Sequence, residues 1–106
     1  MIPLIELLKF PIQDFAVEYR IHATKRMFER DITESNIEAV LTSGIVIENY
    51  KDDFPLPSIL LSGKSSEGRP LHIVVGINLT EKILVIITAY EPDPGKWFED
   101  FSRRHK

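Results

Sequence analysis

The chain has 106 residues, of which 43% are hydrophobic and 27% charged, and its formal net charge is −3 at pH 7. This length fits one domain, and the composition is that of a globular protein rather than a disordered one. The lack of cysteine excludes disulfides and thiolate metal sites, and the acidic balance argues against a protein coated in positive charge for nonspecific nucleic-acid binding.

The first ten residues are apolar, with helical spacing at Leu4, Leu7 and Leu8, and Pro11 predicts that this helix ends near Lys9. We expect residues 1–16 to be an N-terminal extension of a single domain over residues 1–106. The apolar run is interrupted by charges and has no basic region before it, so it is a poor signal peptide. No run approaches the ~20 residues that cross a bilayer, which predicts a cytoplasmic protein without a membrane partner.

A second helix is expected to begin between Phe15 and His22 and to run to Glu29 or Arg30. The alternation in residues 17–21 suits a strand equally well, so the start of this helix stays open. Thr33 is a suitable N-cap for a third helix that carries Ile37, Val40 and Leu41 on its apolar side. Gly44 then stands where a left-handed residue after the helix is expected.

After Gly44 the sequence becomes rich in β-formers, and we predict strands over residues 45–50, 58–63, 71–78 and 83–90. Pro94 suits the first turn of a final helix through Trp97, Phe98 and Phe101. The expected fold class is therefore α+β, with N-terminal helices, a four-stranded antiparallel β-meander and a C-terminal helix.

The last two strands predict one wholly apolar sheet face, which should meet the helices. The residues expected on it are Leu71, Ile73, Val75, Ile77, Ile83, Val85, Ile87 and Ala89. If Ile77 lies across from Ile83, then His72 lies opposite Thr88 and diagonal to Tyr90.

The segment from His22 to Ile32 is the strongest functional signal in the chain. On a helix, His22, Arg26 and Arg30 are spaced four residues apart and share one side, with Lys25 beside them. A titratable imidazole next to permanent cations suits a phosphate group. The alternative is structural, because His22 could cap or pack, and the arginines could pair with nearby carboxylates on a solvated face.

His72 and Tyr90 are the other candidates for chemistry, since one lies within a strand and the other ends one. A hydrogen-bonded sheet histidine and a strand-terminating tyrosine are the structural alternatives. The carboxylate pairs Asp52–Asp53 and Glu91–Asp93 fit no known ligand loop, and the histidines lack zinc-ligand spacing, so we expect no metal and no cofactor.

Two motifs resemble a large family of small prokaryotic proteins that is labelled a domain of unknown function. One is His-Ala-x-x-Arg-Met-x-x-Arg-x-Ile from His22 to Ile32, and the other is the Tyr-Glu-Pro that begins at Tyr90. The resemblance covers about residues 17–102. Such proteins resemble the RelE/ParE-like toxins, BrnT-type members included, in their plan of helices followed by a meander.

This resemblance implies a single toxin-like domain that acts as a metal-independent endoribonuclease (mRNA interferase-like) within a toxin–antitoxin system. It further implies RNA as substrate and a small MqsA-like or YgiT-type zinc-finger protein as antitoxin partner. Carried onto this chain, His22, His72 and Tyr90 would be catalytic, and Lys25, Arg26 and Arg30 would hold RNA phosphate. The alternative that we keep is a non-catalytic module that binds the same kind of partner protein.

Overall fold

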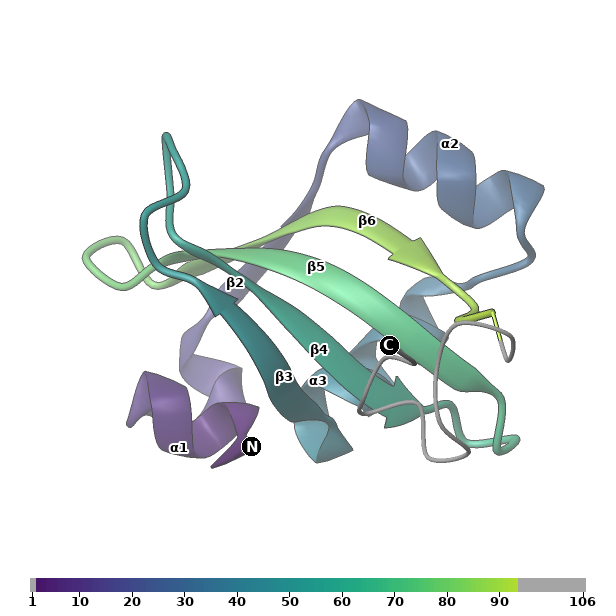
Figure 1. Ribbon diagram of the computed structural model, residues 1–106, viewed down its shortest axis with the longest axis horizontal. Helices are drawn as coiled ribbons and strands as arrows, with labels where there is room; N and C mark the ends of the chain where they lie inside the picture. Colours follow the sequence, from purple (N-terminus) through teal and green to yellow (C-terminus); the bar gives the residue numbers. More distant parts are fainter. Residues whose placement is uncertain (1, 94–106) are drawn as a thin grey trace.

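The computed structural model describes residues 2–93, which form one six-stranded sheet with short helices (Figure 1). The order of the strands across the sheet is β1-β3-β4-β5-β6-β2. The elements are β1 (Ile2–Pro3), α1 (Leu4–Leu8), the 3₁₀ helix η1 (Ile12–Asp14), β2 (Ala16–Tyr19), α2 (Ile21–Glu29), α3 (Glu34–Ser43), β3 (Ile45–Tyr50), β4 (Ser58–Lys64), β5 (Pro70–Asn78) and β6 (Ile83–Tyr90).

The predicted four-stranded antiparallel meander is wrong, because the sheet is mixed and has six strands. β1 extends one edge by pairing antiparallel with β3, and β2 extends the other by pairing parallel with β6. The strand alternative left open for residues 17–21 is confirmed in part, since β2 covers Ala16–Tyr19 and α2 begins at Ile21. β1, with two residues, is too short to show a hydrophobic period. The predicted C-terminal helix, with Trp97, Phe98 and Phe101, lies outside the described residues.

The predicted pairing of β5 with β6 is also wrong, by one residue at Ile77 and by two at His72. Ile77 lies opposite Leu84, and a bulge between the pairs of Val74 and Val75 brings His72 directly opposite Tyr90. Ala89 is buried as predicted, but the other buried residues of β6 are Leu84 and Ile86, in place of the predicted Ile83, Val85 and Ile87. The tight connection over residues 79–82 sets the pairing next to the turn, where Ile77 lies opposite Leu84. The extra residue of the bulge then shifts the pairing by one, which places Ala89 in the core.

The hydrophobic core lies between the sheet and its helices. Leu4 and Leu8 of α1 and Ile37, Val40 and Leu41 of α3 pack against buried strand residues. Figure 1 shows α2 alongside β6, and this helix adds Ala23 and Met27 to the same core.

The third helix begins as predicted, since the Thr33 side chain accepts a hydrogen bond from the Asn36 backbone N–H. Its end differs from the prediction, because Gly44 has φ −75° and not a left-handed conformation. A Cβ on Gly44 would lie 2.5 Å from the Val40 carbonyl oxygen and 3.1 Å from Leu61 Cγ. Close packing of the α3 end on β4, rather than backbone conformation, therefore requires glycine here.

Candidate functional site

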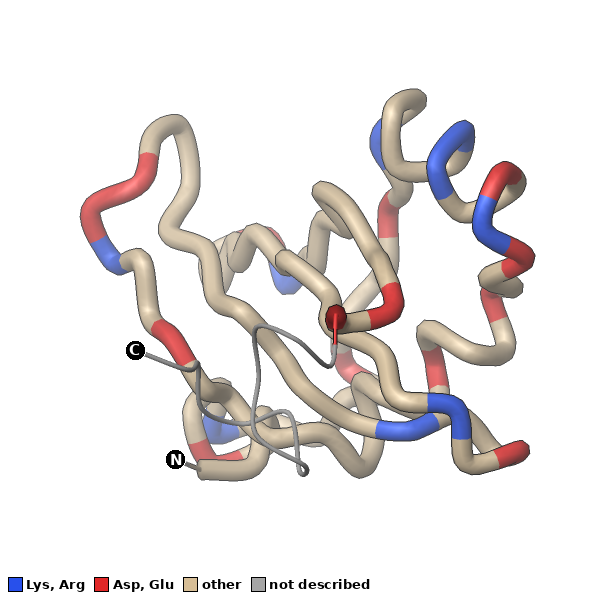
Figure 2. The backbone as a smooth tube through the Cα atoms, turned by 45° about the vertical axis from the view of Figure 1, so that its right-hand side comes forward, with Lys and Arg blue, Asp and Glu red and all other residues tan. Residues whose placement is uncertain are grey.

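The helix α2 presents the predicted phosphate-binding residues to solvent. Its residues Ala23 and Met27 are buried against the sheet, so the opposite side of the helix carries His22, Lys25 and Arg26, all of them exposed. The basic positions of α2 stand together at the upper right of Figure 2. An imidazole and two cations thus share one solvent-facing helical surface, which we call the α2 basic face.

Arg26 and Arg30 differ in what they contact, although the sequence places them on one side of the helix. Arg26 Nη1 lies 3.1 Å from Glu29 Oε1, and the two side chains are 49% and 46% exposed. Arg30 follows the last residue of α2 and turns toward the sheet, where its Nη1 donates to the Ala89 carbonyl oxygen at 2.8 Å. Arg30 therefore joins the end of the helix to the end of β6.

Arg69 lies at this same junction and was not among the predicted residues. Its Nε donates to Glu91 Oε2 at 2.8 Å, its Nη1 to the Asp31 carbonyl at 2.7 Å, and its Nη2 to the Arg30 carbonyl at 2.7 Å. Its side chain is 29% exposed. Two of the three acceptors are backbone carbonyls 38 and 39 residues away in the chain, so no local sequence signal marks this residue.

His72 and Tyr90 form a second pair, at the end of the β5–β6 hairpin that lies nearest to Arg69. Their ring centroids are 5.6 Å apart, with the planes at 66°, in an edge-to-face arrangement. His72 is completely buried and Tyr90 is partly buried. The imidazole of His72 is therefore enclosed by protein, unlike that of His22.

The six predicted site residues thus form two groups. His22, Lys25 and Arg26 make the exposed α2 basic face, while Arg30, His72 and Tyr90 lie where α2 meets the end of the sheet. Three pockets lined by described residues, of about 200, 390 and 520 Å³, include none of the six. The catalytic and phosphate-binding roles of these residues stay predictions.

Carboxylates of α3 act on a neighbouring tyrosine of β2. Burial, together with the charges of Glu34 and Glu38, raises the pKa of Tyr19 to about 12.

Within residues 2–93, no three His, Asp or Glu side chains gather closely enough to hold a metal ion. None of the helices in that range has the length and the apolar run needed to span a bilayer.

Residues 19–91, more than half of the chain, match the family described as "Domain of unknown function (DUF4258)". The chain belongs to this family. The matched range includes α2, Arg69, the His72–Tyr90 pair and all six predicted site residues, whereas β1, α1 and η1 precede it. No curated protein and no solved structure matches the chain.

Proposed function

We propose that this DUF4258 protein is a metal-independent endoribonuclease of the toxin type that binds RNA along the α2 basic face. The observation that supports this most directly is the exposure of His22, Lys25 and Arg26 on one helical surface. Guanidinium and ammonium groups bind phosphate, and an imidazole exchanges protons near neutral pH.

The reaction needs few groups. The ribose 2′-oxygen attacks the adjacent phosphorus, the bond from phosphorus to the 5′-oxygen breaks, and a 2′,3′-cyclic phosphate and a 5′-hydroxyl are the products. One group accepts the proton of the 2′-hydroxyl, and another gives a proton to the leaving 5′-oxygen. Each positioned acid or base contributes roughly 10²–10⁴-fold, and cations stabilise the charge that builds on the phosphate.

The exposure of each side chain indicates whether it would transfer a proton or hold phosphate in this reaction. His22 is the proton-transfer group in this proposal, because RNA can reach its imidazole while His72 is enclosed. Lys25 and Arg26 hold phosphate. The ion pair of Arg26 with Glu29 is half exposed and therefore contributes only ~0–1 kcal/mol, so a phosphate can displace the carboxylate.

Arg30, His72 and Tyr90, where α2 meets the end of the sheet, would assist the α2 basic face. Arg30 bonds Ala89 through one N–H, and its guanidinium has further N–H groups that can reach a phosphate. Tyr90 would donate a hydrogen bond or act as the acid, and His72 lies against its ring.

The proposal uses residues of two motifs that led us to expect this family, His22 to Ile32 and the Tyr-Glu-Pro that starts at Tyr90. The likeness to RelE/ParE-like toxins was expected from a plan of helices followed by a four-stranded meander, and the mixed six-stranded sheet does not have that plan. The proposal is therefore supported by the exposed residues of α2 and not by the fold. A small MqsA-like or YgiT-type zinc-finger protein would be the antitoxin, and it would restrain the enzyme by covering α2.

The test is cleavage of single-stranded RNA by the purified chain in the presence of a chelator. We expect products that end in a 2′,3′-cyclic phosphate and no cleavage of DNA of the same sequence, which lacks the 2′-hydroxyl. His22→Ala should lower the rate roughly 10²-fold or more, since it removes an acid–base group. Lys25→Ala with Arg26→Ala should weaken RNA binding and flatten its dependence on salt.

Alanine suits exposed helical positions, so these variants should fold, and circular dichroism checks this. Lys64→Ala is the matched control, because it removes an exposed cation at the end of β4 and should leave cleavage unchanged. An inert wild-type protein, or equal cleavage by wild type and His22→Ala, would refute the proposal.

A second candidate function is that of a non-catalytic module that binds a partner protein. It is favoured by Ile21 and Phe28, which are both 85% exposed and lie seven residues apart on α2. Large apolar side chains so exposed on a helix are typical of an interface. Co-purification with a zinc-finger partner that Phe28→Ser abolishes, together with inert RNA assays, would establish this function instead.

A further inference from the structure

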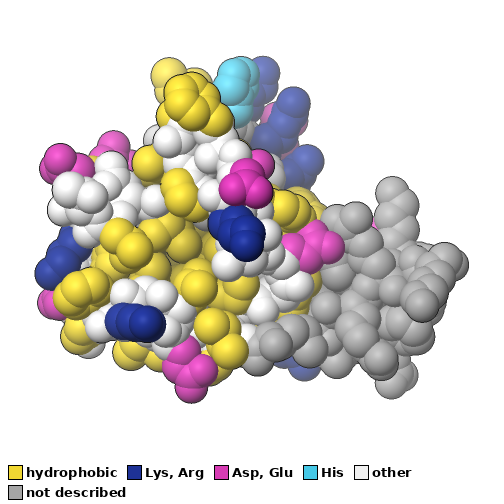
Figure 3. Space-filling model, turned by 60° about the vertical axis from the view of Figure 1, so that its left-hand side comes forward, with side chains coloured by type: hydrophobic (Ala, Val, Ile, Leu, Met, Phe, Trp, Pro, Cys, Tyr) yellow, Lys and Arg dark blue, Asp and Glu magenta, His cyan; other side chains and the backbone are white. Residues whose placement is uncertain are grey.

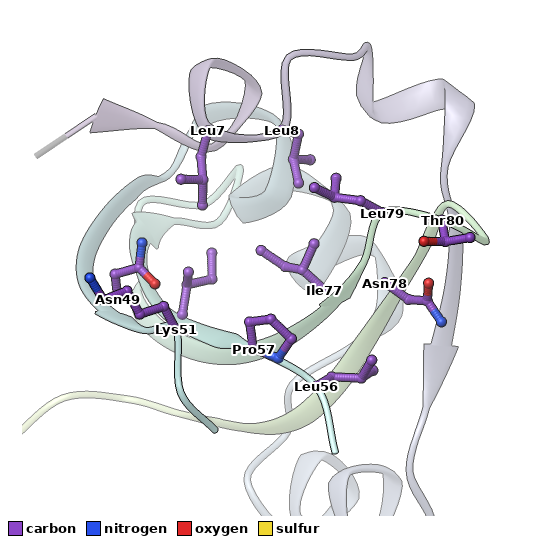
Figure 4. A pocket seen from close by; sticks show the side chains of 11 residues that line it. Leu7, Leu8, Asn49, Lys51, Leu56, Pro57, Ile77, Asn78, Leu79 and Thr80 are labelled. Carbon is purple, nitrogen blue, oxygen red and sulfur yellow. The ribbon is translucent and has the colours of Figure 1, made fainter. Parts of the chain in front are cut away.

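An apolar hollow lies at the far end of the β5–β6 hairpin from His72 and Tyr90. Its volume is about 390 Å³, within the ~300–1,000 Å³ range of ligand sites. Leu7 and Leu8 of α1 form one wall, and Leu56 and Pro57 of the loop before β4 form another. Figure 4 shows Ile77 pointing into the space between them.

The hollow is an open continuation of the hydrophobic core. Ile59 and Ile77 form part of its lining and are only 1% and 9% exposed, whereas Leu79 at its rim is 51% exposed. Figure 3 shows that apolar side chains dominate this side of the molecule. A bound apolar chain would remove the rim from water and extend the packing of the core.

Polar groups line two ends of the hollow. Figure 4 places Asn49 and Lys51 at one end, and Asn78 and Thr80 at the other. Asn78 Oδ1 already accepts a hydrogen bond from the Glu81 backbone N–H at 3.0 Å, so its amide N–H₂ is the part of the side chain left to contact a ligand. The amides and the hydroxyl can donate or accept, whereas the ammonium of Lys51 can only donate, so the Lys51 end suits an acceptor such as a carboxylate.

Lys51 is the one ionisable side chain that lines the hollow. The nearby carboxylate of Asp53 accepts a hydrogen bond from Ser58 Oγ at 2.5 Å and does not line it. The one charge that lines the hollow is therefore positive, which suits an anionic head group at the Lys51 end of the hollow.

We propose that this hollow binds a free medium-chain carboxylic acid. The hydrocarbon chain would lie between α1 and Ile77, and the carboxylate would meet Lys51. The site does not depend on the proposed ribonuclease activity, because none of its lining residues belongs to the α2 basic face.

Decanoate is the probe, titrated into the full chain below its micelle-forming concentration and followed by calorimetry and by NMR of leucine and isoleucine methyl groups. We expect saturable one-to-one binding, with methyl shifts at Leu7, Leu8 and Ile77. Decan-1-ol should bind at least about tenfold more weakly, since it lacks the charge that Lys51 attracts.

Two variants test the two ends of the ligand. Lys51→Glu should weaken decanoate at least about tenfold and improve the binding of decylammonium, because the charge that lines the hollow is reversed. Leu79→Asp, at an exposed wall position that should not disturb folding, should weaken decanoate by a similar factor. Lys64→Glu, an exposed lysine outside the hollow, is the matched control and should change the affinity less than about twofold.

Three outcomes of the decanoate experiments would overturn the proposal. They are the absence of saturable binding, an affinity that neither Lys51→Glu nor Leu79→Asp changes, and methyl shifts that fall elsewhere. Anionic phosphatidylglycerol vesicles form a separate arm of the experiment. Binding to the vesicles without binding of free decanoate would indicate a membrane surface as the anionic partner and would also refute the proposal.

Discussion

His22 and His72 show how the fold separates two identical side chains. The sequence makes both of them candidates for proton transfer, since imidazole is a common general acid and base in proteins. His22 lies exposed on α2 among cations, whereas His72 is completely enclosed and packs edge-on against Tyr90. Only His22 can therefore touch a large substrate, and His72 can act only through its neighbours.

Tyr19 is a residue whose surroundings change its acidity. It lies partly buried in β2, and burial with the charges of Glu34 and Glu38 raises its pKa to about 12. In the unfolded chain the same hydroxyl ionises near pH ~10. Between these two values the unfolded state has lost a proton that the folded state keeps, so unfolding becomes more favourable as the pH rises.

We therefore predict that the stability contributed by Tyr19 is fully present below about pH 10 and is lost as the pH rises toward about 12. The loss should be roughly 1 kcal/mol in total, less than the ~1.4 kcal/mol per pH unit of a fully buried group, because solvent screens a partly exposed hydroxyl. Urea unfolding of wild type and Tyr19→Phe across this range measures it. Parallel stability curves for the two proteins would contradict the prediction.

At the scale of the element, α3 is the helix whose start is best explained by its own sequence. Thr33 accepts a hydrogen bond from the Asn36 backbone N–H at 3.1 Å, and Asn36 Oδ1 accepts one from the Thr33 N–H at 2.9 Å. This reciprocal capping box satisfies two backbone donors that the helix leaves open. Glu34 in the first turn adds a favourable interaction with the helix dipole.

Thr33→Ala should lower the free energy of unfolding by about 1 kcal/mol, because it removes the capping acceptor. Thr42→Ala is the matched control, since Thr42 Oγ1 donates to the Glu38 carbonyl at 2.9 Å on an exposed part of the same helix. That hydrogen bond contributes little within a helix, so we expect a change within about 0.5 kcal/mol. Denaturant midpoints that shift equally for the two variants would argue against the cap.

At the scale of the whole molecule, Arg69 connects segments that are distant in the sequence. Its guanidinium joins the carbonyls between α2 and α3 to Glu91 after β6, and its own backbone closes the turn before β5. The corner that carries Arg30 is therefore fixed to the sheet at several points. This junction determines how the α2 basic face is held relative to Tyr90.

Arg69→Ala should destabilise the fold by about 2–3 kcal/mol, because it leaves two carbonyl groups and a carboxylate without their charged donor. Arg69→Lys should recover only part of this loss, since an ammonium cannot reproduce the planar fork. Arg26→Ala breaks a half-exposed ion pair and serves as the comparison, with an expected loss below about 1 kcal/mol. Equal losses for Arg69→Ala and Arg26→Ala would show that Arg69 does not hold this corner.

The family match begins at Tyr19, yet the chain before it contributes to the same core. Leu4 and Leu8 of α1 are almost fully buried, and β2 completes one edge of the sheet. Residues 1–16, expected as an extension, thus include segments that pack on the sheet and form one wall of the proposed carboxylate site.

The sequence by itself determined the local features of this protein. Three such features are found close to where they were predicted: the strand ranges after Gly44, the Thr33 cap of α3 and the end of the first helix near Lys9. All three depend on neighbouring residues. The basic side of α2 is local in the same sense, because a helix places residues four apart on one side.

Only the tertiary structure decided which elements pair and which side chains meet. The two edge strands, the register that sets His72 against Tyr90 and the bonds of Arg69 all join residues far apart in the chain. Such contacts depend on how the core is filled and on which carbonyl groups remain to be paired, and neither leaves a periodic pattern in the sequence. The sequence thus identified Arg26 and Arg30 as cations on one side of α2. Only the packed molecule determined that Arg26 pairs with Glu29 on the exposed surface, while Arg30 donates to the Ala89 carbonyl of the sheet.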